Sequence, residues 1–136
     1  MTVPHVSTVA MQPGAVLFER QLPAAGRERI ALFSIATEDP NPIHVDDDFA
    51  HRAGFATVLQ QGPMTTAQFA RLLEECAGRG RLRALDITFT APVFPEDALT
   101  LRAEVTEVGA TVQCALTATK PDGTKTATGM AELSTS

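Results

Sequence analysis

The second half of the chain alternates apolar and polar residues with a period of two, the pattern of half-buried β-strands. Turn-forming residues separate four such runs, which cover residues 85–90, 99–106, 112–118 and 127–133. Four strands in succession predict an antiparallel meander. Pro92 and Pro95 interrupt the chain after the first run, which indicates a break or a sheet edge at that point.

A long helical pattern precedes these strands. Apolar side chains recur there at i, i+3, i+4 and i+7, namely Phe69, Leu72, Leu73 and Cys76. Gly62 opens this segment, and Pro63 fits its first helical positions. We therefore predict an α+β fold, in which a curled antiparallel sheet wraps around a long central helix. Because open sheet edges pair readily with a second copy, we expect a homodimer.

Shorter elements are predicted in the first third of the chain. Residues 1–15 show no sustained period and are expected to form an N-terminal arm, which leads into a short strand at 16–20. Mixed apolar and charged residues predict a short amphipathic helix over 26–36. A further helix is predicted over 47–53, with Asp46 as its N-cap.

Length and composition fit one domain over residues 1–136. Apolar residues make up 44% and charged residues 20%, and no apolar run is long enough for a membrane span. The first residues lack the basic and apolar regions of a signal peptide, which predicts a cytoplasmic protein. A net charge of −5, from 11 basic and 16 acidic residues, argues against nucleic-acid binding.

Candidate chemistry is densest in the segment 39–44, Asp-Pro-Asn-Pro-Ile-His. Pro40 and Pro42 lack amide donors and disfavour helix at the residues before them, so we predict a stiff loop. Aspartate accepts protons or orients water, and histidine changes charge near physiological pH, so Asp39 and His44 fit an acid/base pair. A plain helix-stop loop, in which Asp39 caps a backbone amide, explains the same residues.

Two further clusters have candidate roles. Arg79, Arg81 and Arg83 surround a glycine-rich turn, where guanidinium groups fit phosphate contacts, although a solvated turn explains them as readily. The acidic residues 46–48 follow His44 and resemble metal ligands, but a helix start accounts for them. We therefore expect no metal and no other cofactor.

Several segments together resemble the MaoC-like family of (R)-specific enoyl-CoA hydratases. The matching segments are 36–46, 53–55, 61–65 and 87–97. The Asp-x-Asn-Pro-x-His element is the specific part, and the resemblance spans about 14–133, nearly the whole chain. It implies a hot-dog fold, a role in fatty acid metabolism, and a homodimer whose acyl tunnel lies near the subunit interface.

The resemblance also implies a reaction, in which water adds reversibly to a trans-2-enoyl thioester of CoA or acyl carrier protein to give an (R)-3-hydroxyacyl thioester. On this analogy Asp39 and His44 hold and activate the water and deliver a proton to the α-carbon. The backbone amide of Gly62 would bind the thioester carbonyl, which gains negative charge during attack. Asn41 is expected to fix the loop backbone.

Three positions depart from the family's pattern. Glu38 stands where glycine is usual, Gln61 where histidine is frequent, and Ala67 where many members have serine; we expect Glu38 to point outward. These departures motivate an alternative, a non-catalytic acyl-binding subunit of a heteromeric hydratase. A hot-dog thioesterase is a third possibility, although the central helix carries its carboxylates, Glu74 and Glu75, only toward its far end.

Overall fold

The computed structural model describes residues 11–135, so most of the predicted N-terminal arm lies outside the described residues. The helices are α1 (Gly26–Ala36), α2 (Asp47–Arg52) and α3 (Gly62–Ala77), with a short 3₁₀ turn, η1 (Pro42–His44). The strands are β1 (Val16–Leu22), β2 (Leu82–Phe89), β3 (Leu99–Val108), β4 (Thr111–Thr119) and β5 (Lys125–Ser134). This content confirms the predicted α+β class.

The five strands form one antiparallel sheet in the order β1-β3-β4-β5-β2. The meander prediction is right for β3, β4 and β5 but wrong for β2, which pairs with β5 instead of β3. Residues 90–98, which link β2 to β3, are too many for a tight hairpin and contain Pro92 and Pro95, which donate no ladder hydrogen bonds. β1 takes the position beside β3.

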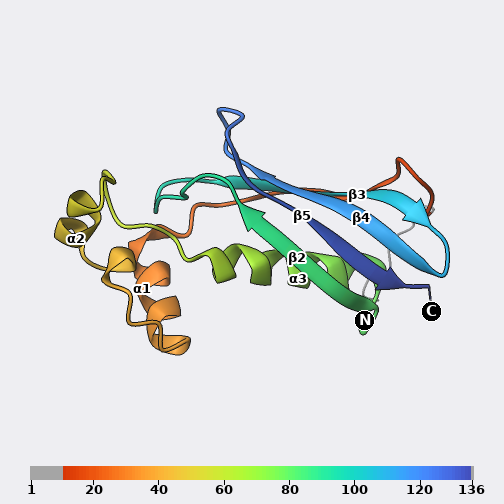
Figure 1. Cartoon of the computed structure of the whole chain (residues 1–136), viewed down its shortest axis with the longest axis horizontal. Coiled ribbons are helices and arrows are strands. Elements are labelled where there is room, and N and C mark those ends of the chain that lie inside the picture. Colours follow the sequence, from red (N-terminus) through yellow and green to blue (C-terminus); the bar gives the residue numbers. More distant parts are fainter. Residues whose placement is uncertain (1–10, 136) are drawn as a thin grey trace, which may run out of the picture.

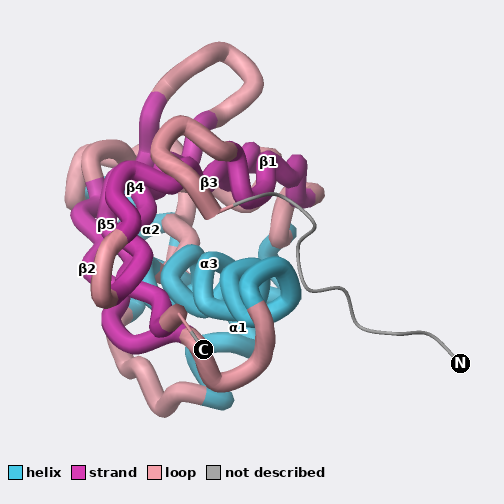
Figure 2. The backbone as a smooth tube through the Cα atoms, turned by 90° about the vertical axis from the view of Figure 1, so that its right-hand side faces the viewer, coloured by secondary structure: helices cyan, strands magenta, loops and turns pink. Residues whose placement is uncertain are grey.

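Helix α3 lies along the inner face of this sheet, and the two views agree that the strands curl around it (Figures 1 and 2). Its buried residues are Met64, Thr65, Phe69, Leu72, Leu73 and Ala77. Alternate residues of β3 and β4 are buried against the same core. Each leucine buried in this way contributes about 1.5–3 kcal/mol. The packing confirms the predicted central helix wrapped by a sheet.

Helix α1 has its predicted bounds but not the predicted amphipathic character. Ile30 is fully buried, whereas Leu32 is 55% and Ile35 is 74% exposed. Both α1 and α2 lie beyond the N-terminal end of α3, away from most of the sheet (Figure 1). Only a narrow side of α1 meets other elements there, so its remaining apolar side chains face outward.

Gly129 of β5 lies too close to β2 for any side chain. A Cβ at this position would collide with the carbonyl oxygen of Asp86 and would lie 2.8 Å from Cδ1 of Ile87. We predict that Gly129→Ala lowers the free energy of unfolding by about 1–3 kcal/mol, because only a backbone shift relieves the clash. Urea denaturation measures this.

Gly109 provides the matched control, since a Cβ there has no neighbour within 4 Å. Gly109→Ala is expected to change stability by less than about 0.5 kcal/mol. Equal losses in the two variants would contradict the close approach of β5 and β2.

Candidate active site

The loop after α1 is held by hydrogen bonds from its backbone amides to a carbonyl of α1 and to two of its own side chains. The Asp39 amide donates to the Ser34 carbonyl at 2.9 Å, and Asp39 Oδ1 accepts from the Asn41 amide at 3.0 Å. Asn41 Oδ1 in turn accepts from the Ile43 amide at 3.1 Å and caps η1. Asp39 therefore caps a backbone amide with one carboxylate oxygen and keeps the other free for a different partner.

His44 lies opposite that second oxygen. Its Nδ1 lies 2.8 Å from the Leu59 carbonyl, which only accepts, so Nδ1 carries the hydrogen. Nε2 then faces Asp39 Oδ2 at 3.5 Å. The His44 side chain is 12% exposed and that of Asp39 is 32% exposed, so the pair is partly buried yet accessible. The structure thus brings together the two predicted acid/base residues.

Gly62 begins α3 only three residues after Leu59, the residue that binds His44. As the first helical residue, it has an amide with no carbonyl partner inside the helix. A groove of about 390 Å³ runs past it, lined in part by Phe55, Leu59 and Phe89. The Phe89 ring covers Gly62 so closely that a Cβ there would lie 2.8 Å from Cε2. Any side chain at this position would have to displace the ring.

Gln61 contributes a link that no sequence pattern indicated. Its side chain is 1% exposed, and Nε2 donates to the Ile30 carbonyl and to Ser34 Oγ, both at 2.8 Å. Gln61 Oε1 has no hydrogen-bond partner within residues 11–135. Since the Ser34 carbonyl holds the Asp39 amide, Gln61 connects the start of α3 to the loop that carries the acid/base pair.

Glu38 adopts a left-handed conformation, with φ of +55°. Glycine reaches this region without the steric cost that other residues incur, about 1 kcal/mol or more, which explains the family's usual glycine there. Glu38 is exposed, as expected, so its carboxylate is directed away from the interior. Ala67 lines a separate groove between α1 and α3, together with Phe33 and Ala36.

The arginine-rich turn lies at the opposite end of α3, roughly 22 Å along the helix axis from Gly62. Arg81 donates to the carbonyls of Ala77 and Ser134 and so serves the end of the helix. Arg79 and Arg83 are exposed and form no ion pair with a described residue. Phosphate contacts by these arginines stay a prediction, and the chain's own Gly62 is distant from them.

The carboxylates of α3 are also engaged at that far end. Glu74 accepts a hydrogen bond from the Gly80 amide at 2.8 Å, and Glu75 pairs with Arg71 at 2.6 Å. Neither lies near the helix start. Among residues 11–135, no group of three metal-binding side chains comes together, and no helix there is long and apolar enough to cross a membrane.

Asp47 joins α2 to two neighbouring segments. Its carboxylate accepts from Arg27 Nη2 at 2.7 Å and from Thr57 Oγ1 at 2.9 Å, and the Val58 amide donates to it at 3.2 Å. The hydrogen bonds from Arg27, and then from Thr57, hold the pKa of Asp47 below its ordinary value of 3.8. This contact holds the segment before α3 against α1 and α2.

Known proteins are similar in sequence to the part of the chain that forms this fold and site. Residues 8–126 match a family model described as the MaoC like domain. The chain belongs to the MaoC-like family. An (R)-specific enoyl-CoA hydratase of Aeromonas caviae is 32% identical over 83 residues, which are 60% of this chain and 62% of that relative. The fatty acid synthase subunit beta of Aspergillus oryzae is 38% identical over 76 residues, 53% of this chain and 4% of that protein.

This MaoC-like chain thus spans less than two thirds of these relatives' lengths. The solved structure of the A. caviae (R)-hydratase involved in PHA biosynthesis has a TM-score of 0.80 at 25% identity, covering 92% of this chain and 97% of that one. One chain of the ChsH1-ChsH2 complex from Mycobacterium tuberculosis has a TM-score of 0.82 at 24% identity, covering 92% and 98%. These matches confirm the predicted hot-dog fold.

We predict that Asp47→Asn lowers the melting temperature at about pH 7. The folded-state pKa of Asp47 is depressed, so its stabilising effect is present above the unfolded pKa and is lost as pH falls through the lower folded pKa. The difference in melting temperature between wild type and variant should therefore narrow as the pH falls below 3.8, the ordinary pKa of Asp47. Thermal melts followed by circular dichroism measure it.

Asp48→Asn is the matched control, because Asp48 occupies the same helical turn and its side chain has no partner among the described residues. Its effect at about pH 7 should be smaller than that of Asp47→Asn. If the difference in melting temperature between wild type and Asp47→Asn stays equally large at acid pH, the Arg27–Asp47–Thr57 contact is contradicted.

Proposed function

We propose that this protein is a hydratase/dehydratase that adds water reversibly to a trans-2-enoyl thioester of CoA or acyl carrier protein and forms an (R)-3-hydroxyacyl thioester. One observation carries the proposal: Asp39 and His44 face each other at 3.5 Å, and His44 is anchored to Leu59 beside the helix start at Gly62. An acid/base pair and the first amide of α3 thus lie on either side of one short segment.

The tautomer of His44 defines how water can be held. With the hydrogen on Nδ1, the neutral ring presents a lone pair at Nε2, opposite the carboxylate oxygen of Asp39. Two acceptors do not bond each other, but each can accept one hydrogen of a water molecule that lies beside them. The oxygen of that water then has a lone pair directed toward a substrate in front of the pair.

In the hydration step, the water oxygen bonds to the β-carbon and the carbon–carbon double bond becomes single. One water hydrogen passes to the Asp39–His44 pair, and a proton from the pair bonds to the α-carbon, so one whole water molecule is added. Because the same pair serves both carbons, both groups arrive on one face of the double bond. Dehydration is the reverse of these steps.

Attack at the β-carbon moves negative charge onto the thioester oxygen. We assign the Gly62 amide to that oxygen, because it is unpaired within the helix and lies at the positive end of the α3 dipole. A fixed donor of this kind is worth about 10²–10³ in rate. Asn41 and Gln61 act as supports, through the contacts that hold the loop and join it to α3.

Similarity supports the reaction class. The A. caviae relative is named an (R)-specific enoyl-CoA hydratase, and the matched family is that of MaoC-like dehydratases. We extend the proposal to a homodimer in fatty acid metabolism; a cytoplasmic location stays a prediction. Phe89 is 49% exposed on the edge strand β2, and Met130 is 44% exposed on the neighbouring strand β5, which offers apolar surface for pairing.

The non-catalytic alternative has one observation in its favour, since a similar fold occurs in the two-protein ChsH1-ChsH2 complex. A subunit of that kind would need a partner for activity. Turnover by the purified chain alone, eluting as a homodimer on size exclusion, decides between the two.

We predict that Asp39→Asn and His44→Gln each lower kcat for crotonyl-CoA hydration by about 10²–10⁴, because each removes one proton-transfer group. Loss of the conjugated enoyl absorbance measures the rate. Asp48→Asn and His51→Gln make the same chemical changes on α2 and should leave the rate within about threefold of wild type. Unchanged rates in the Asp39 and His44 variants contradict the proposal, and release of free CoA would indicate a thioesterase.

Gly62→Ala tests the close contact between Gly62 and the Phe89 ring at the groove. The added methyl must displace the Phe89 ring, which is half-exposed and can move, so stability should change by less than about 1 kcal/mol. The displaced ring narrows the groove, and kcat/KM for crotonyl-CoA should fall about tenfold or more. Adding Phe89→Ala removes the clash and should restore most of the loss; an equally inactive double variant would show that the methyl itself blocks the amide.

A further inference from the structure

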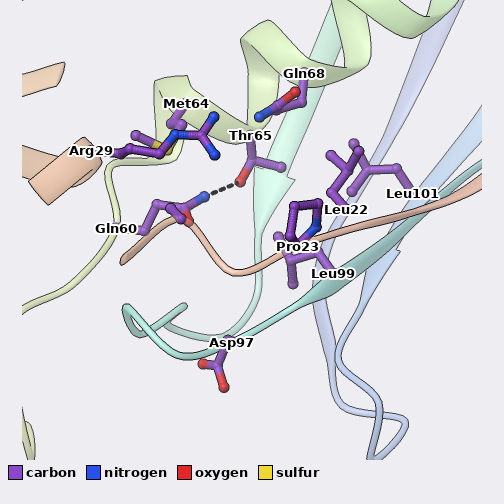
Figure 3. Close-up of a pocket in the computed structure, with 11 residues that line it drawn as sticks. Leu22, Pro23, Arg29, Gln60, Met64, Thr65, Gln68, Asp97, Leu99 and Leu101 are labelled. Carbon is purple, nitrogen blue, oxygen red and sulfur yellow. Dashed lines mark hydrogen bonds between the residues drawn. The ribbon is translucent and has the colours of Figure 1, made fainter. Parts of the chain in front are cut away.

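A second and much smaller space lies behind the groove that passes Gly62. It has a volume of about 20 Å³ and lies between α3 and strands β1 and β3. Leu22, Met64, Leu99 and Leu101 give it mostly apolar walls (Figure 3). A space of this size accommodates about one water molecule, so it is too small for an acyl chain.

Gln60 and Thr65 line both the groove and this cavity. Gln60 Nε2 donates to Thr65 Oγ1 at 3.1 Å, and Figure 3 shows the two side chains pointing toward one another. Thr65 is only 3% exposed. The backbone amide of Gln60 donates to the Val93 carbonyl at 2.8 Å. Both residues are therefore held in place, and together they form a wall between the two spaces.

The position of this wall relative to Gly62 is set by the helix. Thr65 follows Gly62 by three residues, so it lies about one turn, roughly 4.5 Å, further along the same side of α3. A thioester whose carbonyl binds the Gly62 amide places its reacting carbons beside the amide. The remainder of its acyl chain then lies in the groove. The Gln60–Thr65 pair separates this groove from the small cavity between α3 and the sheet.

We infer that the Gln60–Thr65 pair limits the acyl chain and makes this protein selective for short-chain 2-enoyl thioesters. The inference rests on the proposed function, because it assigns the groove to the acyl group. A long chain has to separate the pair and leave the buried Thr65 hydroxyl and the half-buried Gln60 side-chain amide unpaired, which is costly. Behind the pair it finds only the one-water cavity.

The test uses the double variant Gln60→Ala/Thr65→Ala, which joins the two spaces. Wild type and variant are compared by kcat/KM for crotonyl-CoA and trans-2-dodecenoyl-CoA. We expect wild type to favour crotonyl-CoA by at least about tenfold, and the variant to raise the dodecenoyl-to-crotonyl ratio by about tenfold or more, since a few extra methylenes are accommodated. An unchanged ratio overturns the inference.

Binding of saturated acyl-CoAs makes the test independent of turnover. Calorimetric titration with butyryl-CoA and lauroyl-CoA should show the same change of preference between wild type and variant. If neither protein turns over an enoyl-CoA but the binding preference shifts, the wall is supported while the proposed function fails. If crotonyl-CoA is turned over but the binding preference is the same in wild type and variant, the proposed function is supported and the inference about the Gln60–Thr65 pair is wrong.

Thr66→Ala is the matched control, because Thr66 is adjacent on α3 and lines neither space. Its dodecenoyl-to-crotonyl ratio of kcat/KM should equal that of wild type. A rise in this ratio as large as that of the double variant overturns the inference. If the double variant does not fold, as judged by circular dichroism, Gln60→Ala alone opens one side of the wall. This single variant should still raise the ratio by about threefold or more.

Discussion

The burial of α3 against the inner face of the sheet is the constraint on which the rest of this structure depends. Its leucines and Phe69 contribute most of the contact, and they fix both the axis and the rotation of the helix. The helix start at Gly62 is thereby held at one end of the sheet, under the ring of Phe89. An amide that must meet a developing charge needs such a rigid support.

Polar contacts then attach the catalytic loop to this rigid start. Nδ1 of His44 binds the Leu59 carbonyl, Gln61 reaches Ser34 and Ile30 of α1, and Asp47 accepts from Thr57 and the Val58 amide. All three contacts converge on residues 57–61, the segment just before α3. The outer helices have few buried residues, so these hydrogen bonds do much to attach the loop of the acid/base pair to the segment before Gly62.

Two of the three departures from the family's usual residues, Glu38 and Gln61, fall at the same junction and have physical explanations. Glu38 accepts a left-handed φ of +55° and remains exposed, so the loop keeps its course at a modest conformational cost. Gln61 is buried and bonded to α1, so its amide keeps a link between helix and loop. The facing of Asp39 and His44 therefore survives both changes.

Local signals in the sequence determined the helix starts at Asp46 and Gly62, the strand period, and the stiff loop that carries Asp39 and His44, because capping, proline geometry and side-chain alternation act between near neighbours. Only the tertiary structure decided that β2 pairs with β5, that Gln61 reaches Ser34, that Phe89 covers Gly62, and that Gln60 meets Thr65 between two spaces. The first three of these contacts join elements that are distant in sequence and that packing brings together. Apolar burial has no direction of its own, so no periodicity along the chain encodes which partners meet.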